Sequence, residues 1–168
     1  LDERVAPVQK VFYFTNPCFS PDGRYLWFQA AWPPGPQHFL AVADLQQGTA
    51  RPFRWAQLGS RPLVDDERQG CYATVGPRIY FQPADGGPPE QVFELAPDIV
   101  QDRPVHQMCT HVSKSCDGDR IALTGKVGLR WFLGYADLSS GDTHVLHWFD
   151  RNVNHEQYSP TDPHLILF

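Results

Sequence analysis

Polar side chains that can bind a ligand recur at one position of a repeated sequence pattern. Asn16, His111 and His155 each stand shortly before the aspartate of a turn. Ser60 takes the matching place in a weaker copy of the pattern, and Arg61 lies beside it. Amide, imidazole and guanidinium groups all form hydrogen bonds with polar ligands. Because the copies place them at equivalent points, we interpret these residues as a binding constellation.

Neighbouring residues add to this interpretation at the last copy. Gln157 lies two residues after His155, and we include it in the predicted substrate-binding set. Arg130 and Arg151 could contact a carboxylate through two parallel hydrogen bonds, but their loop positions fit solvated side chains better. The chain has no Gly-x-Ser-x-Gly, phosphate-loop or His-Glu-x-x-His motif. The sequence therefore assigns neither a catalytic residue nor a metal ligand.

The repeated pattern consists of a tight turn followed by a short apolar run. Its copies span residues 16–28, 111–124 and 155–168, with a weaker copy at 63–74. The turn aspartates are Asp22, Asp66, Asp117 and Asp162. A period of roughly 40–50 residues with several strand-like runs in each period is typical of β-propeller blades. Side chains at the start of the innermost strand of a blade face the mouth of the central channel, which is where we place the binding constellation.

The sequence predicts an all-β fold, a β-propeller of four-stranded antiparallel blades. The 16 prolines and 13 glycines, together with few helical patterns, agree with a fold rich in turns. The predicted blades are 14–54, 58–96 and 106–149, with the start of a fourth at 153–168. Because a propeller needs at least four blades to close, we expect this chain to be part of a longer protein, with about as much again or slightly more beyond Phe168. We expect Val8 to Tyr13 to belong to a different blade, closed by the missing part.

Charge and hydropathy argue against some partners. The net charge of -5 makes nucleic acid an improbable ligand, since nucleic-acid-binding domains usually carry a basic patch. The sequence contains no run of about 18 apolar residues, so it predicts no membrane span. The first residues also lack the basic and apolar regions of a signal peptide. We therefore expect a cytoplasmic protein with neither a nucleic-acid nor a membrane partner.

Two stretches resemble one known family. The segments 14–23 (FTNPCFSPDG) and 154–163 (NHEQYSPTDP), the latter followed by the apolar run 165–168, are similar to segments of the oligogalacturonate lyases. The resemblance extends over most of the chain but is specific only at these two stretches. It implies a seven-bladed propeller that cleaves short pectin fragments, and a small acidic oligosaccharide as the ligand.

The resemblance also implies a chemistry. A base removes the C5 proton of a uronate, the 4-linked oxygen leaves, and a divalent metal on the carboxylate stabilises the developing charge. In the family the metal is typically manganese, held by three histidines and a glutamine, and the base is a histidine with an arginine nearby. These motifs belong to later blades, beyond Phe168. Only His155 can be carried over, with a substrate-facing role; His111 has no counterpart, and Asn16 matches only as part of the first-blade motif.

Two other functions agree with the same sequence. A non-catalytic propeller that binds sugar or protein would lack a histidine cluster in its remaining blades. A propeller cap of a prolyl-oligopeptidase-like serine peptidase would be followed by an α/β-hydrolase domain with a Gly-x-Ser-x-Gly motif. The sequence alone leaves these alternatives open beside the lyase.

Overall fold

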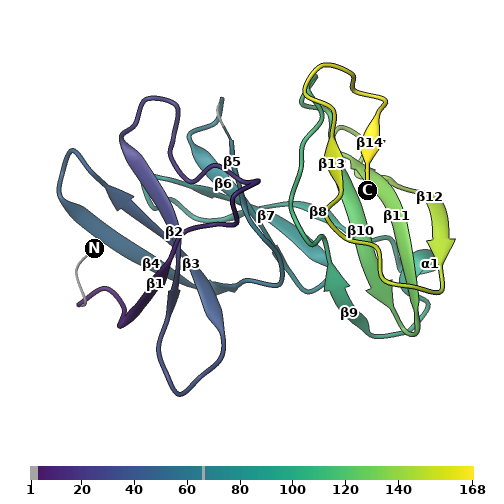
Figure 1. Ribbon diagram of the computed structural model, residues 1–168, viewed down its shortest axis with the longest axis horizontal. Helices are drawn as coiled ribbons and strands as arrows, with labels where there is room; N and C mark the ends of the chain where they lie inside the picture. The colour runs from purple at the N-terminus through teal and green to yellow at the C-terminus, as the bar shows by residue number, and fades with distance from the viewer. Residues whose placement is uncertain (1–3, 66) are drawn as a thin grey trace.

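The chain folds into a series of antiparallel β-sheets, which confirms the predicted all-β class. The computed structural model describes residues 4–65 and 67–168. Asp66, one of the predicted turn aspartates, lies outside the described residues. Three four-stranded sheets follow one another along the longest axis of the molecule (Figure 1). The arrangement of successive four-stranded sheets is that of propeller blades.

The three sheets have the same meander topology, in which each strand pairs with the next along the chain. The first sheet contains β1 (Val8–Lys10), β2 (Tyr25–Ala31), β3 (His38–Asp44) and β4 (Thr49–Gln57). The second contains β5 (Leu63–Asp65), β6 (Gly70–Val75), β7 (Arg78–Pro83) and β8 (Glu90–Glu94). The third contains β9 (Val105–Met108), β10 (Arg120–Val127), β11 (Arg130–Asp137) and β12 (Thr143–Phe149).

One short helix and two short strands complete the described chain. Helix α1 (Pro97–Val100) connects the second sheet to the third. Strands β13 (Gln157–Tyr158) and β14 (Ile166–Leu167) pair with each other as a two-stranded sheet. Within the described residues, no helix has the length and apolar character needed to cross a membrane.

Apolar cores lie between successive sheets. Trp27 and Leu40 of the first sheet belong to the same buried cluster as Val64 and Cys71 of the second. A larger cluster joins the second and third sheets, with members Tyr72, Ile79, Phe81, Phe93, Met108, Ile121, Leu123 and Phe132. The side chains alternate between the two faces of each strand, so each sheet can contribute to the core on either side of it. Face-to-face packing of this kind fixes the sheets relative to one another.

The prediction for Val8 to Tyr13 is wrong for the part that forms a strand. β1 pairs with the end of β2, with Val8 opposite Ala31, and is the first strand of the first sheet rather than part of another blade. Farther along the chain, Phe19 forms an isolated bridge with Leu26 of the same strand β2. The inner strand is therefore split into two pieces, with a loop between Lys10 and Phe19.

The repeated turn has the same hydrogen-bond network in two copies. Ser20 donates its hydroxyl hydrogen to Asp22, and Ser115 does the same to Asp117. Each serine oxygen also accepts the backbone N–H of the first residue of the following strand. The residue after each aspartate is a glycine with φ of 69° or 85°, a conformation that a side chain would strain. The repeat is thus a structural turn that starts the second strand of a blade.

Candidate functional site

The predicted site residue His111 lies on a bulge in an inner strand. Strand β9 pairs with β10 up to Met108, and pairing resumes at the bridge between Lys114 and Ile121. The residues between leave the regular ladder, and Cys109 has a positive φ of 51°. A bulge of this kind redirects side chains out of a sheet. It brings His111 towards the neighbouring inner strands.

The bulge of the third sheet is joined directly to the second sheet. The Arg61 backbone N–H donates to the Thr110 carbonyl oxygen at 3.0 Å, and the Val112 N–H donates to the Arg61 carbonyl oxygen at 2.9 Å. These two bonds form a parallel bridge between Arg61 and His111. Two residues that are 50 positions apart in the sequence are therefore held as neighbours by their main chains.

Asn16 ties the first sheet to the same point. Its amide nitrogen donates to the carbonyl oxygens of Pro62 at 3.0 Å and Val112 at 3.1 Å. Its amide oxygen accepts the hydroxyl hydrogen of Thr15, and the residue is only 6% exposed. Substrate binding by Asn16 stays a prediction. In this structure its side chain joins three inner strands.

A cavity of about 400 Å³ opens where these inner segments meet. Its walls include Tyr13, Arg61, Gln107, His111, Asn154 and His155. These residues come from the first, second and third sheets and from the segment leading into β13. The volume lies within the usual range for small-ligand pockets, about 300–1,000 Å³. Three of the five predicted binding residues, Arg61, His111 and His155, are therefore brought together.

Three of the residues that line this cavity have rings in contact with one another. The rings of His111 and His155 stack with centroids 4.7 Å apart and an interplanar angle of 25°. Tyr13 lies 5.0 Å from His111 and 5.8 Å from His155. Phe14 adjoins Tyr13 at 4.3 Å and is 85% exposed. The result is an apolar, partly exposed surface beside polar ring atoms.

The two histidines differ in their surroundings. His111 is 5% exposed, whereas His155 is exposed. Burial, together with the nearby His155 and Arg61, lowers the pKa of His111 to about 4. Among residues 4–65 and 67–168, nothing forms a hydrogen bond with its Nε2 atom. His111 is therefore neutral at physiological pH, with a buried ring nitrogen that lacks a protein partner.

This lowered pKa predicts an acid-sensitive stability. As pH falls from 6.5 to about 4, the unfolded state takes up a proton on His111 that the folded state does not, so the free energy of unfolding decreases. Urea denaturation of the full-length protein across this range should show a smaller decrease for His111→Gln, by about 1–3 kcal/mol. His106→Gln, at an exposed position, is the control and should behave as the unaltered protein does. Equal pH dependence in all three proteins would contradict the prediction.

Gln157 lies apart from the other predicted residues. It lines a neighbouring cavity of about 230 Å³, together with Asn16 and His111. His111 lines both this cavity and the one beside Arg61. Substrate binding by Gln157 stays a prediction.

Sequence reasoning missed three residues of this region. Tyr13 was assigned to another blade, and neither Thr110 nor Glu156 was singled out. Glu156 is fully buried and accepts hydrogen bonds from Thr110. Strand alternation could not have identified Glu156, because His155 has a φ of 62° and precedes strand β13, so the segment is not extended there. A buried carboxyl group requires hydrogen-bond partners.

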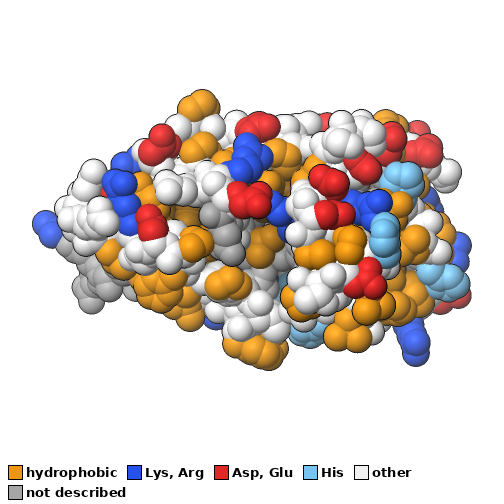
Figure 2. Space-filling view, turned by 90° about the horizontal axis from the view of Figure 1, so that it is seen from above, with side chains coloured by type: hydrophobic (Ala, Val, Ile, Leu, Met, Phe, Trp, Pro, Cys, Tyr) orange, Lys and Arg blue, Asp and Glu red, His pale blue; other side chains and the backbone are white. Residues whose placement is uncertain are grey.

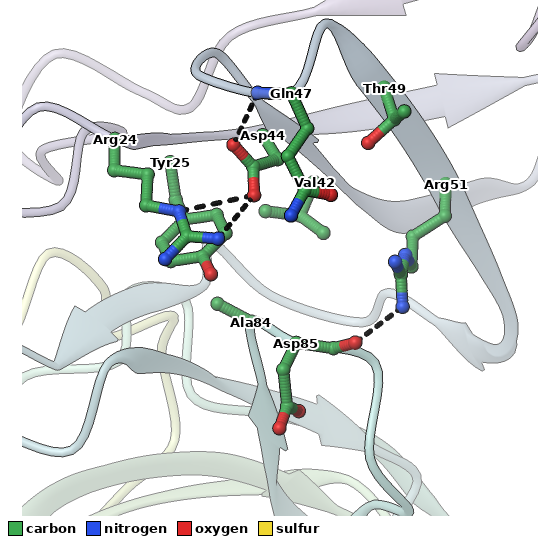
Figure 3. A pocket seen from close by; sticks show the side chains of 9 residues that line it. All are labelled: Arg24, Tyr25, Val42, Asp44, Gln47, Thr49, Arg51, Ala84 and Asp85. Carbon is green, nitrogen blue, oxygen red and sulfur yellow. Dashed lines mark hydrogen bonds and ion pairs between the residues drawn. The ribbon is translucent and has the colours of Figure 1, made fainter.

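A second polar cavity, of about 100 Å³, lies between the first two sheets (Figure 3). The arginine side chains that line it form hydrogen bonds within the fold. Arg24 forms two hydrogen bonds with one oxygen of Asp44, and the other oxygen of Asp44 accepts the backbone N–H groups of the turn after β3. Arg51 donates to the Asp85 carbonyl oxygen across the sheets. Both guanidinium groups are engaged, so this cavity is a weaker candidate.

Neither the surface nor the described metal-binding groups point to another kind of site. Figure 2 shows acidic and basic side chains intermixed on the face in view, and the expected lack of a nucleic-acid partner stays a prediction. Within residues 4–65 and 67–168, no three His, Cys, Asp or Glu side chains are arranged to hold a metal ion. The described residues therefore do not provide a manganese site.

The fold is similar to that of two solved oligogalacturonate lyases. For one, in complex with manganese, the TM-score is 0.67 at 16% identity; for the other, from Vibrio parahaemolyticus, it is 0.68 at 11% identity. Each alignment covers 92% of this chain and 44% of the lyase. TolB from Acinetobacter baumannii matches with a TM-score of 0.54 and 17% identity, over 76% of this chain and 31% of TolB.

These likenesses establish the propeller fold. No model of a known protein family matches the chain, and no curated protein sequence does. The chain spans less than half of the length of the lyases it resembles. At these identities, the activity of the whole protein is a matter for proposal.

Proposed function

We propose that this chain is part of a lyase that cleaves oligogalacturonides by metal-assisted β-elimination. The observation that carries the proposal is the cavity beside Arg61, His111 and His155. Support also comes from the fold, which is shared with two solved oligogalacturonate lyases, and from the two sequence stretches that resemble that family.

The cavity offers the groups that an acidic sugar requires. Arg61 lines it. Among residues 4–65 and 67–168, its guanidinium forms no hydrogen bond or ion pair. A free guanidinium can bind a carboxylate through two hydrogen bonds. The Tyr13 ring and the histidine pair offer an apolar face beside polar atoms, which suits a sugar ring with its hydroxyl groups.

In this proposal the chain binds and orients the substrate. Arg61 holds a uronate carboxylate, and His155, Asn154 and the neutral His111 contact its hydroxyl groups. Because the described residues do not fit a metal, we assign no step through a metal to this chain. The divalent metal, manganese in the family, and the base that removes the C5 proton are placed on residues outside this chain.

The test is elimination by the full-length protein. Digalacturonate should yield an unsaturated product, measured by the rise in its ultraviolet absorbance. A chelator should abolish the rise and added manganese should restore it. A metal-loaded, folded protein that binds digalacturonate without any rise would overturn the lyase and favour the non-catalytic sugar-binding propeller.

A further inference from the structure

A buried carboxyl group contacts Thr110, one of the residues that line the cavity. The side chain of Glu156 is fully buried, whereas His155, the residue before it, is exposed and lines the cavity. The two carboxyl oxygens of Glu156 accept hydrogen bonds from one residue: Oε1 from the backbone N–H of Thr110 at 3.1 Å, and Oε2 from its hydroxyl group at 2.7 Å. Burial raises the pKa of Glu156, and the hydrogen bonds from Thr110 oppose this rise. In the ionised form, both carboxyl oxygens act as acceptors. Glu156 therefore orients the Thr110 hydroxyl group.

The Thr110 hydroxyl group transmits this orientation to both histidines. A hydroxyl has a single hydrogen, and here it is donated to Glu156. The Thr110 oxygen can then only accept further hydrogen bonds. One comes from the backbone N–H of His155 at 2.9 Å, and the other contact is with Nδ1 of His111 at 3.4 Å.

We propose that Glu156, acting through Thr110, is a positioning residue that keeps the proton of neutral His111 on Nδ1 and leaves its Nε2 lone pair for a ligand. A neutral imidazole carries one proton, so a donating Nδ1 makes Nε2 an acceptor. Within the described residues, this Nε2 has no partner. The chemistry that it selects is a hydrogen-bond donor, such as a hydroxyl group.

The same contacts position His155. Its φ of 62° lies in the left-handed region, which residues with side chains seldom adopt. The bond from its backbone N–H to the Thr110 oxygen holds the chain in this conformation. Glu156 thus supports both members of the stacked histidine pair. That the donor is a sugar hydroxyl rests on the proposed function, whereas the position of the His111 proton does not.

The proton can be located by nitrogen NMR of the full-length protein labelled with ¹⁵N-histidine, in mildly alkaline buffer and without ligand. The His111 signals are assigned by their loss in His111→Gln. We expect the unaltered protein to show a protonated Nδ1 and a bare Nε2. Thr110→Ser retains the hydroxyl group and should keep this form, whereas Thr110→Val should lose the preference for it.

Glu156→Gln provides a sharper outcome. The amide oxygen can accept the Thr110 backbone N–H, so the amide nitrogen donates to the Thr110 oxygen. The Thr110 hydroxyl hydrogen then turns towards His111 Nδ1, and the imidazole proton should move to Nε2. A proton on Nε2 in the unaltered protein would overturn the proposal. So would an unchanged tautomer in Thr110→Val, which decides the matter even if Glu156→Gln fails to fold.

This experiment is independent of catalysis. A protein that shows the expected tautomers but has no lyase activity would support the positioning role and overturn only the proposed function. A protein that has lyase activity, but whose His111 tautomer is unchanged in Thr110→Val and Glu156→Gln, would support the proposed function and overturn only the positioning role.

Discussion

Replacing Lys114 with methionine is expected to lower the free energy of unfolding by about 3 kcal/mol. The Lys114 Nζ atom lies 2.7 Å from Oδ2 of Asp65, and the Asp65 side chain is fully buried. This ion pair joins the second sheet to the third. Methionine fills similar space but leaves the carboxylate of Asp65 without its counter-charge, which is far more costly than losing an exposed ion pair.

The pH dependence of this effect has a definite sign. Burial raises the pKa of Asp65, but the Lys114 ammonium and the backbone N–H groups of Arg68 and Glu67 outweigh it and hold that pKa below its usual value. A lowered carboxyl pKa stabilises the folded state near neutral pH, and this stabilisation is lost as pH falls through the folded-state value. The difference between the two proteins should therefore be largest near neutral pH and shrink in acid.

Urea denaturation of the full-length protein measures this effect, with Arg78→Met as the matched control. Arg78 forms an ion pair with Glu94 in which both side chains are 44% exposed, so its loss should lower the free energy of unfolding much less than the loss of Lys114 does. Adding Asp65→Asn to Lys114→Met removes the stranded charge and should recover part of the stability. Equal losses for Lys114→Met and Arg78→Met would show that the buried pair contributes no more than a surface pair.

The turns of this fold could be predicted because their cause is local. The hydrogen-bond network spans only Ser20 to Tyr25, so the matching Ser115, Asp117 and Gly118 give the same turn. Strand β1 could not be predicted in this way. Its three residues pair with Gln29 to Ala31 across a loop, and no local pattern specifies such a partner.

The candidate site could be predicted in part for the same reason. Alignment on the turn placed Asn16, His111 and His155 at equivalent points, and the structure does bring their segments together. It could not show that the Asn16 amide is engaged by carbonyl groups, because those carbonyl groups belong to Pro62 and Val112, which are distant in the sequence. Nor could it show the role of Glu156, whose partners come from another sheet.

The second large effect is expected at Arg61. Arg61→Gln should weaken the binding of digalacturonate to the full-length protein roughly 10- to 100-fold, since a hydrogen bond to a charged group contributes about 1.5–3 kcal/mol. Arg61 lines the cavity and, among the described residues, its side chain forms no ion pair with a carboxylate. Its backbone bonds to Thr110 and Val112 do not depend on the side chain, so the fold around the cavity should be retained.

Isothermal titration calorimetry measures this change, and two further variants define its cause. Arg61→Lys keeps the charge but loses the two-pronged geometry, so it should bind with intermediate affinity. Arg151→Gln removes an exposed arginine away from the cavity and should bind as the unaltered protein does. If the cause were a long-range charge effect, Arg61→Gln and Arg151→Gln would weaken binding by similar amounts. Both losses of affinity would then be larger at low salt, where charges are screened less. Loss of affinity confined to Arg61 would instead locate the uronate carboxylate at this guanidinium, which is the contact on which the proposed function depends.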